Sequence, residues 1–150
     1  MKLYAAPLNF RPIAREFDVR TDFAPSLHKE AAGLEDRFAG SRIDARAIPF
    51  VTIDPEGSKD LDQAVHVEKR DGGGYTVRYA IADVAAFVPA DSEVHAESLK
   101  RGQTIYLPDE PARLHPEELS EGSASLLPNV DRPAVLWTFS LDDDGEVVDA

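Results

Sequence analysis

The clearest pattern in the sequence is a pair of alternating apolar and polar runs near the middle of the chain. Residues 64–69 and 75–82 alternate with a period of two, which is typical of strands that present two different faces. The segment between them contains Asp71-Gly72-Gly73-Gly74, a strong signal for a tight turn. The pattern therefore predicts a β-hairpin over residues 64–82.

Further extended segments flank this hairpin. Residues 50–53 form a short β-rich run, and residues 104–107 are expected to be extended. Residues 134–141 predict a strong strand with Trp137 in the core, and Asp144-Gly145 predicts a turn into a last strand from residue 146. A final strand with so few residues after it suggests that the natural domain continues beyond residue 150.

Helical spacing occurs on both sides of the hairpin. A helix is expected from Pro25 to Gly40, because apolar residues recur at intervals of three to four, at Leu27, Ala31, Leu34 and Phe38. Shorter helical segments are expected over residues 13–17 and after Pro116. Asp91 or Ser92 can cap another helix that ends near Arg101.

These elements predict an α+β fold, in which helices pack against a mostly antiparallel, twisted sheet. A chain of 150 residues with 43% hydrophobic content fits one domain with a core of its own. We expect residues 1–47 to be a partly helical lead-in and residues 48–150 to be the main unit. No stretch approaches the roughly 20 apolar residues of a membrane span, so no membrane association is expected.

Composition and charge narrow the chemistry. The sequence has no cysteine, which excludes disulfides, thiolate zinc sites and cysteine nucleophiles, and a cytoplasmic location is the simple expectation. The net charge is −12, from 16 Lys and Arg against 28 Asp and Glu. Because nucleic-acid binders usually carry a basic surface, composition alone argues against RNA binding.

Residues 54–62 carry the strongest candidate chemistry. Asp54 follows the apolar run, and an extended backbone places Asp60 and Asp62 on one face, about 7 Å apart. Three converging carboxylates repel one another unless a hard cation such as Mg²⁺ or Mn²⁺ lies between them. This favours metal-dependent phosphodiester hydrolysis. A solvated acidic loop remains an alternative, as does a Ca²⁺ loop, although Gln63 stands where an EF-hand requires glycine.

Four sequence blocks add a family resemblance. They are FVTIDPEGSKDLDQA at residues 50–64, YAIADVAAFV at 79–88, RGQTIYLPD at 101–109 and LHPEELSEGSASLLPNVDRPA at 114–134. In this order they closely resemble the first half of the RNB catalytic domain of ribonuclease II, ribonuclease R and the related exosome nuclease. The resemblance covers about residues 48–148. It implies a Mg²⁺-dependent 3′→5′ exoribonuclease that acts on single-stranded RNA and releases nucleoside 5′-monophosphates.

The resemblance also implies roles for individual residues. The acidic motif of the family has four aspartates, of which Asp54, Asp60 and Asp62 match the first three and would be metal ligands. The fourth falls on Gln63, which offers a carbonyl oxygen but no charge, so Gln63 would be a weak or indirect ligand. Tyr106 matches a tyrosine that stacks on the base at the RNA 3′ end. Without the resemblance, Tyr106 would be read as a ring packed on a strand.

Two other functions stay open on sequence alone. A catalytically impaired relative that binds RNA or regulates would explain Gln63, and an unrelated acidic interaction module would explain the charge. Asp83 could support the acidic loop or, more simply, cap the end of a strand. Arg101, Arg113 and Arg132 could line an RNA channel, although each alone suggests a surface charge. Because the RNA-clamping residues of the family lie outside this stretch, these 150 residues alone are expected to bind RNA weakly.

Overall fold

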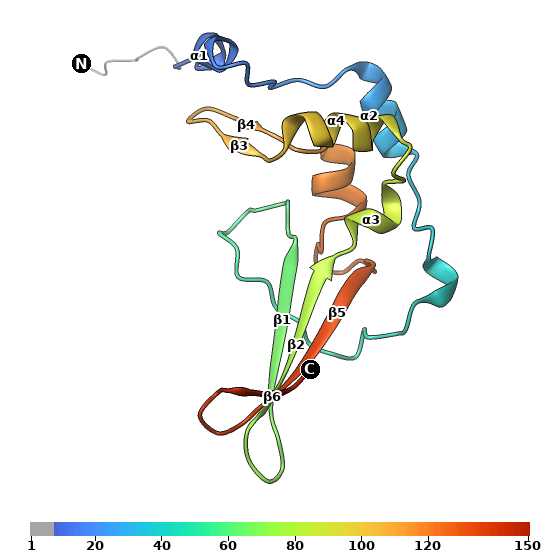
Figure 1. Cartoon of the computed structure of the whole chain (residues 1–150), viewed down its shortest axis with the longest axis vertical. Helices are drawn as coiled ribbons and strands as arrows, with labels where there is room; N and C mark the ends of the chain where they lie inside the picture. Colours follow the sequence, from blue (N-terminus) through green and yellow to red (C-terminus); the bar gives the residue numbers. More distant parts are fainter. Residues whose placement is uncertain (1–7) are drawn as a thin grey trace, which may run out of the picture.

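The structure is a computed structural model that describes residues 8–150, so residues 1–7 of the predicted lead-in lie outside the described part. Most of the helices gather at one end of the molecule, and a four-stranded sheet extends from them to the other end (Figure 1). The α+β prediction is confirmed. The elements are α1 (Arg11–Glu16), α2 (Pro25–Ala32), η1 (Ala39–Ser41), β1 (Gln63–Lys69), β2 (Tyr75–Ala82), α3 (Val84–Phe87), α4 (Glu93–Arg101), β3 (Ile105–Tyr106), β4 (Pro111–Ala112), η2 (Leu119–Ser123), β5 (Ala134–Leu141) and β6 (Val147–Asp149).

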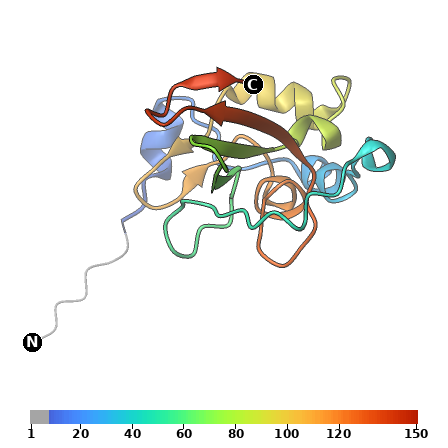
Figure 2. The same cartoon turned by 90° about the horizontal axis from the view of Figure 1, so that it is seen from below.

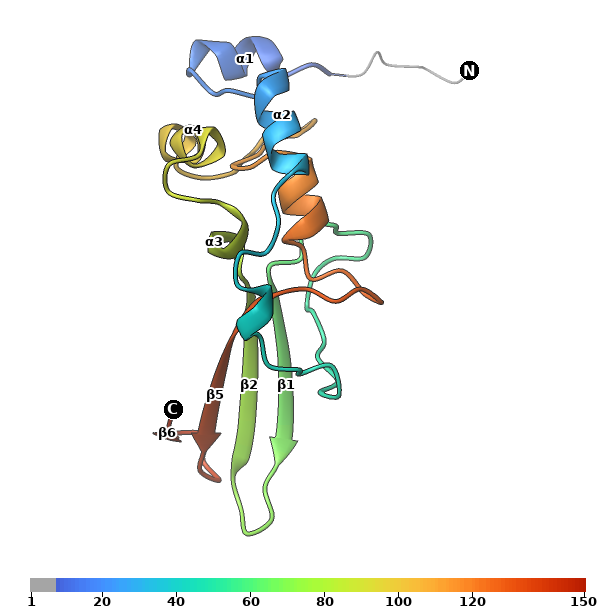
Figure 3. The ribbon, with the colours of Figure 1, turned by 90° about the vertical axis from the view of Figure 1, so that its right-hand side faces the viewer.

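The main sheet has the order β1-β2-β5-β6, and every neighbouring pair is antiparallel. The predicted hairpin forms β1 and β2, and the predicted strand over residues 134–141 forms β5. The β1–β2 turn and the β5–β6 turn lie at the same end of the sheet, far from the helices (Figure 3). The Gly74 N–H of the first turn donates to the Asp143 carboxylate of the second at 2.7 Å. The Asp144-Gly145 turn into β6 is thereby confirmed as a hairpin turn.

The main hydrophobic core lies among the helices rather than across the sheet. It consists of buried side chains from α2, α3, α4 and the segment around η2, namely Leu27, Ala31, Ala86, Phe87, Val88, Val94, Leu119 and Ala124. Helix α4 starts where the Ser92 side chain accepts a hydrogen bond from the His95 N–H at 3.0 Å, as a capping serine does. Helix α4 therefore has a defined first turn, and it contributes Val94 to this core.

Two predicted elements end or form differently. Helix α2 ends at Ala32, not at Gly40, because Gly33, whose helix propensity is low, follows as its C-cap and the chain then turns away. Phe38 consequently lies outside the helix, beside the guanidinium groups of Arg37 and Arg42. The predicted strand over residues 50–53 is reduced to a single bridge between Val51 and Val65.

The prediction that Trp137 lies in the core is wrong. Strand alternation places Trp137 on the same face of the sheet as Tyr79 and Val65, and its side chain is 51% exposed. Its ring stacks on that of Phe139, with centroids 6.3 Å apart. The strand residues that are buried are the small ones on the opposite face, Ala64 and Ala80. One apolar face of the sheet therefore remains open in the described part of the chain.

The remaining elements are short. Strands β3 and β4 form a separate two-stranded hairpin, and the helix expected after Pro116 is a π-helical turn over Leu119–Ser123. Figure 2 shows the segment before β1 running along the sheet edge opposite to β6. Within residues 8–150, no helix is both long enough and apolar enough to cross a membrane.

Candidate functional site

The first half of the acidic segment is fixed against the edge of β1. The Val51 N–H donates to the Val65 carbonyl at 3.0 Å, and the Val65 N–H donates to the Val51 carbonyl at 2.8 Å. This reciprocal pair directs the chain along β1 and carries Asp54 to the start of that strand. The turn that follows closes with a 3.1 Å bond from the Ser58 N–H to the Pro55 carbonyl. Gly57 has φ +89° within it, a conformation that favours glycine.

The second half of the acidic segment is held by Ser125, a residue that is only 1% exposed. The Ser125 hydroxyl donates to the Lys59 carbonyl at 2.5 Å and accepts from the Leu61 N–H at 3.0 Å. The Leu126 N–H also donates to the Leu61 carbonyl at 2.8 Å. Leu61 is buried, so Asp60 and Asp62 on either side of it point outward. The backbone around Asp60 and Asp62 is thus held by contacts some 64 residues away in the chain.

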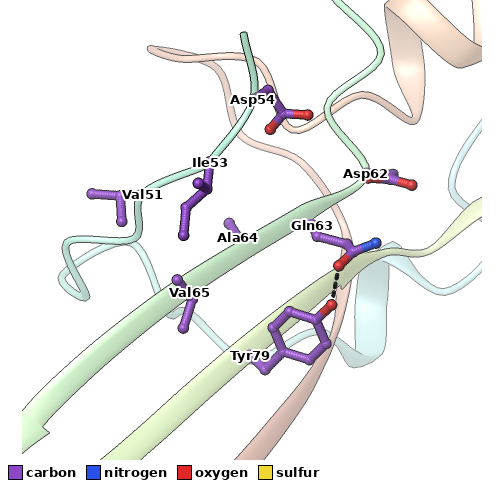
Figure 4. A pocket seen from close by; sticks show the side chains of 8 residues that line it. All are labelled: Val51, Ile53, Asp54, Asp62, Gln63, Ala64, Val65 and Tyr79. Atoms are coloured by element: carbon purple, nitrogen blue, oxygen red, sulfur yellow. Dashed lines mark hydrogen bonds between the residues drawn. The ribbon is translucent and has the colours of Figure 1, made fainter.

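A pocket of about 210 Å³ lies where these two halves meet at the start of β1 (Figure 4). Asp54 and Asp62 line it from separate segments, and the Ala82 N–H holds the Asp62 carbonyl at 2.8 Å. The lining residues are Val51, Ile53, Asp54, Asp62, Gln63, Ala64, Val65 and Tyr79. Its volume is below the roughly 300–1,000 Å³ of pockets for drug-sized ligands, so a phosphate group or a hydrated ion is a better match.

The structure therefore brings together two of the three predicted acids. Asp60 is exposed and does not line the pocket. Among residues 8–150, no group of three or more Asp, Glu, His or Cys side chains is close enough to hold a metal ion. The metal-binding roles of Asp54, Asp60 and Asp62 stay predictions.

Gln63 occupies the pocket beside the two carboxylates. Its side-chain carbonyl oxygen accepts a hydrogen bond from the Tyr79 hydroxyl (Figure 4). In the β1–β2 register Val65 is opposite Tyr79, so Gln63 and Tyr79 are diagonal neighbours on one face of the sheet. Tyr79 was not predicted as a site residue, although the alternating pattern of the hairpin would place it on the same face as Gln63.

The donor set in the pocket suits a hard cation in part. Two carboxylates offer the oxygen ligands that Mg²⁺ prefers, and Mg²⁺ is commonly held by one or two carboxylates together with substrate phosphates and water. Asp54 and Asp62 fit that description, whereas the Gln63 carbonyl oxygen is already engaged by Tyr79. These residues therefore fit a Mg²⁺ ion that receives only some of its oxygen ligands from the protein and the others from a phosphate and water.

Tyr106 lies apart from this pocket, on the two-residue strand β3. Its side chain is 74% exposed, so the alternative of a ring packed against the strand is wrong. An exposed aromatic ring is available for stacking, as a base-binding residue must be. Its contact with RNA stays a prediction.

Asp83 has the structural role that the sequence favoured. Its carboxylate caps α3 by accepting from the Ala86 N–H at 3.1 Å, and it pairs with Arg42 at 2.8 Å. Arg42 also contacts Asp36, and this hydrogen bond holds the pKa of the Asp36 carboxyl below its ordinary value. Asp83 thus links the lead-in to the core.

The reading of the three arginines as surface charges is wrong for Arg101. Its side chain is 4% exposed, and its guanidinium lies 3.6 Å from the centroid of the Phe23 ring. It donates to the carbonyl oxygens of Arg20, Asp22 and Arg113. Arg113 pairs with Glu117 and Glu121, and Arg132 donates to the Ser125 carbonyl, so both have partners within the protein.

Comparisons with known proteins identify relatives of the chain. A family model described as RNB domain matches residues 42–150. Ribonuclease R of Vibrio cholerae serotype O1 is 34% identical over 137 residues, which cover 89% of this chain and 17% of that protein. Exoribonuclease 2 of Vibrio vulnificus is 40% identical over 121 residues, covering 81% and 17%.

The structural comparison agrees. Mycoplasma genitalium RNase R, solved in complex with ribose methylated single-stranded RNA, is similar with a TM-score of 0.84 and 30% identity, covering 92% of this chain and 22% of that one. The chain spans about a fifth of the length of these relatives. The match to the RNB family model agrees with the resemblance carried by the four sequence blocks. That match starts at residue 42, before the predicted boundary between residues 47 and 48. That division into lead-in and main unit stays a prediction.

Proposed function

This chain belongs to the RNB domain family, and on that premise we propose that it carries the acidic part of the active site of a hydrolytic 3′→5′ exoribonuclease. The substrate is single-stranded RNA, and the products are nucleoside 5′-monophosphates. The relatives named ribonuclease R and exoribonuclease 2 support this class of activity. The proposal concerns a larger protein than the described residues, because the chain spans about a fifth of those relatives.

One observation carries the proposal: two carboxylates from different segments line the same small pocket. Asp54 arrives from the edge segment and Asp62 from the start of β1, and Ser125 and Val65 hold the backbone on both sides. A solvated acidic loop would need none of these contacts. The observation therefore favours a site over the alternative of an acidic interaction module.

Asp54 and Asp62 would hold Mg²⁺ or Mn²⁺, with Asp60 as a third ligand if the segment closes around the ion. When bound, such an ion supplies positive charge against the RNA phosphate and lowers the pKa of water. The protein's own contribution is to orient the two carboxylates and to keep the backbone at Leu61 fixed. The cytoplasm is the compartment in which we place this activity, as the cysteine-free composition predicts.

RNA binding is proposed at the exposed ring of Tyr106. Stacking on an aromatic ring tolerates any base and contributes about 1–3 kcal/mol per base, which suits an enzyme that moves along RNA. The structure of the Mycoplasma genitalium relative with single-stranded RNA supports an RNA partner. The charge of −12 limits the affinity of this chain, because an acidic surface repels phosphates.

A metal titration tests the carboxylate site directly. We expect calorimetry with MnCl₂ to show one binding event that Asp62→Asn weakens by about tenfold or more, since even outer partners of metal sites contribute about 10–100-fold to affinity. Glu56→Gln is the matched control, because Glu56 is an exposed acid of the same segment and lies outside the pocket. Equal losses in both variants would indicate general charge attraction and would contradict a defined site.

An RNA assay tests the activity. Residues 42–150 would replace the matching segment of Vibrio cholerae ribonuclease R, and the chimaera would be given 5′-labelled single-stranded RNA with Mg²⁺. We expect the RNA to shorten from its 3′ end, with loss of activity in Asp62→Asn and not in Glu56→Gln. A folded chimaera that binds RNA without shortening it would instead support the catalytically impaired relative, in which Gln63 marks a lost function.

A further inference from the structure

The position of the Gln63 amide has a consequence for what this pocket can bind. Gln63 can offer either its carbonyl oxygen, which a cation or a donor would use, or its NH₂ group, which an anion would use. The Tyr79 hydroxyl donates to the carbonyl oxygen, so that oxygen faces the Tyr79 hydroxyl (Figure 4). The NH₂ group lies at the other end of the same planar amide and points away from Tyr79.

The backbone register makes this arrangement specific. Gln63 and Tyr79 lie two positions apart across the β1–β2 pair and on the same face, which is within reach for long and aromatic side chains. Tyr79 is half-buried, and its backbone is paired with β1 on one side and with β5 on the other. Within residues 8–150, the Gln63 NH₂ group makes no hydrogen bond to another residue, so both of its donors are available.

The charges around the pocket decide which ligand can use those donors. Asp54 and Asp62 both line the pocket with Gln63, and the single Gln63 carbonyl oxygen that a cation could use already accepts from Tyr79. A phosphate that shares a cation with two carboxylates meets electrostatic repulsion from them. A neutral NH₂ group next to the carboxylates supplies a donor for a phosphate oxygen where a fourth carboxylate would repel it.

We propose that Tyr79 is a positioning residue that turns the Gln63 amide so that its NH₂ group binds a phosphate oxygen, and that Gln63 is not a metal ligand. This inference rests on the proposed function for the identity of the phosphate, which belongs to RNA or to a nucleoside 5′-monophosphate. The orientation of the amide itself rests only on the contact between Tyr79 and Gln63. Where the family has a fourth aspartate, Gln63 would then bind a phosphate oxygen instead of a metal ion.

The orientation can be measured without any ligand. The sequence contains only two glutamines, Gln63 and Gln103, so their side-chain NH₂ signals can be assigned in a ¹⁵N–¹H spectrum of the whole chain. Tyr79→Phe removes the hydroxyl and should shift the Gln63 signals while leaving those of Gln103 unchanged. Tyr75→Phe is the matched control, because Tyr75 lies on the same strand and face at the far end of the hairpin. Gln63 signals that respond equally to both variants, or to neither, would overturn the orientation.

Ligand titrations then test what the NH₂ group binds. With Mg²⁺ present, adenosine 5′-monophosphate should shift the Gln63 NH₂ protons downfield, and Tyr79→Phe should weaken its affinity by about two- to tenfold, the range of one hydrogen bond. Affinity for Mg²⁺ alone should stay within about twofold in Tyr79→Phe. If Gln63 were a metal ligand, freeing its carbonyl oxygen would instead strengthen Mg²⁺ binding, and that result would overturn the proposal.

The outcomes separate this inference from the proposed function. Equal nucleotide affinities in the wild type and in Tyr79→Phe, with binding lost in Asp62→Asn, would contradict the role of Gln63 and leave the nuclease site standing. Nucleotide binding that is absent in the wild type, with Mn²⁺ binding also insensitive to Asp62→Asn, would contradict the proposed function. In that case a Gln63 signal that still responds to Tyr79→Phe shows a structural pair only, and the phosphate role falls. Thermal melts of each variant show whether it is folded.

Discussion

Ser125→Ala is the sharpest test of how the acidic segment is held. The Ser125 hydroxyl makes two hydrogen bonds, one on each side of Asp60, and the residue is 1% exposed. Each hydrogen bond contributes about 0.5–1.5 kcal/mol net, and a buried N–H left without an acceptor, here that of Leu61, adds to the loss. We therefore expect the free energy of unfolding to fall by about 2–3 kcal/mol. For a chain of this size that corresponds to roughly 5–10 °C in Tm.

Urea melts measure this loss directly. Ser123→Ala is the matched control, because Ser123 lies two residues away and its hydroxyl makes only a long bond of 3.4 Å to the Glu118 carbonyl. The same change at Ser125 should also weaken Mn²⁺ binding, since the segment that carries Asp62 loses its anchor. An unfolding free energy within about 0.5 kcal/mol of the wild type, the range of ordinary surface substitutions, would refute the reasoning.

Arg101→Met should lower the free energy of unfolding by about 3 kcal/mol in urea melts, because three carbonyl oxygens lose their donor, whereas the exposed Arg46→Met should change it by less than about 1 kcal/mol. Burial lowers the pKa of His115, so stability should be complete above about pH 6.5 and decrease as the pH falls below it towards the folded pKa; urea melts at pH 7.5 and 5.5 should differ less in His115→Gln. Trp137, the only tryptophan, should be quenched readily by acrylamide because it is half exposed, and a shielded emission would show that its face is covered in solution.

The sequence predicted the elements well where local patterns determine them. Alternation and an Asp-Gly-Gly-Gly turn predicted the β1–β2 hairpin. Asp91 or Ser92 was predicted as the cap of α4, and the structure shows that it is Ser92. The end of α2 was missed because an apolar residue recurs at Phe38, although Gly33 is a poor helix former and is the C-cap of the helix. The apolar spacing favours a longer helix and the glycine favours an earlier end, and the spacing alone does not show which of the two prevails.

Burial was harder to predict than strand position. Alternation shows which residues share a face of a sheet, but it does not show which face is covered. Trp137 was expected to lie in the core, yet the buried residues of the main sheet are two alanines, Ala64 and Ala80. Arg101 shows the converse, since a charged residue is buried because backbone carbonyls and the Phe23 ring surround it.

The candidate site depended on contacts that no local pattern contains. Spacing predicted that Asp60 and Asp62 share one face of an extended segment, but the acid that lines the pocket with Asp62 is Asp54. That pairing depends on the bridge from Val51 to β1 and on Ser125, which is 64 residues from Leu61. Ser125 carries no signal in the sequence, because a serine in a turn-rich segment has many local uses.

The open face of the sheet and the candidate pocket are not independent. Val51, Val65 and Tyr79 line the pocket and also belong to the apolar face that includes Trp137. Whatever covers this face in a larger RNB protein would therefore border the carboxylates, exclude water from them and strengthen their interaction with a cation and a phosphate. On this argument the described residues hold the acidic groups in place, while full affinity requires the cover. Mn²⁺ should accordingly bind more weakly to these 150 residues than to the chimaera with ribonuclease R, and equal affinities would mean that the open face has no part in the site.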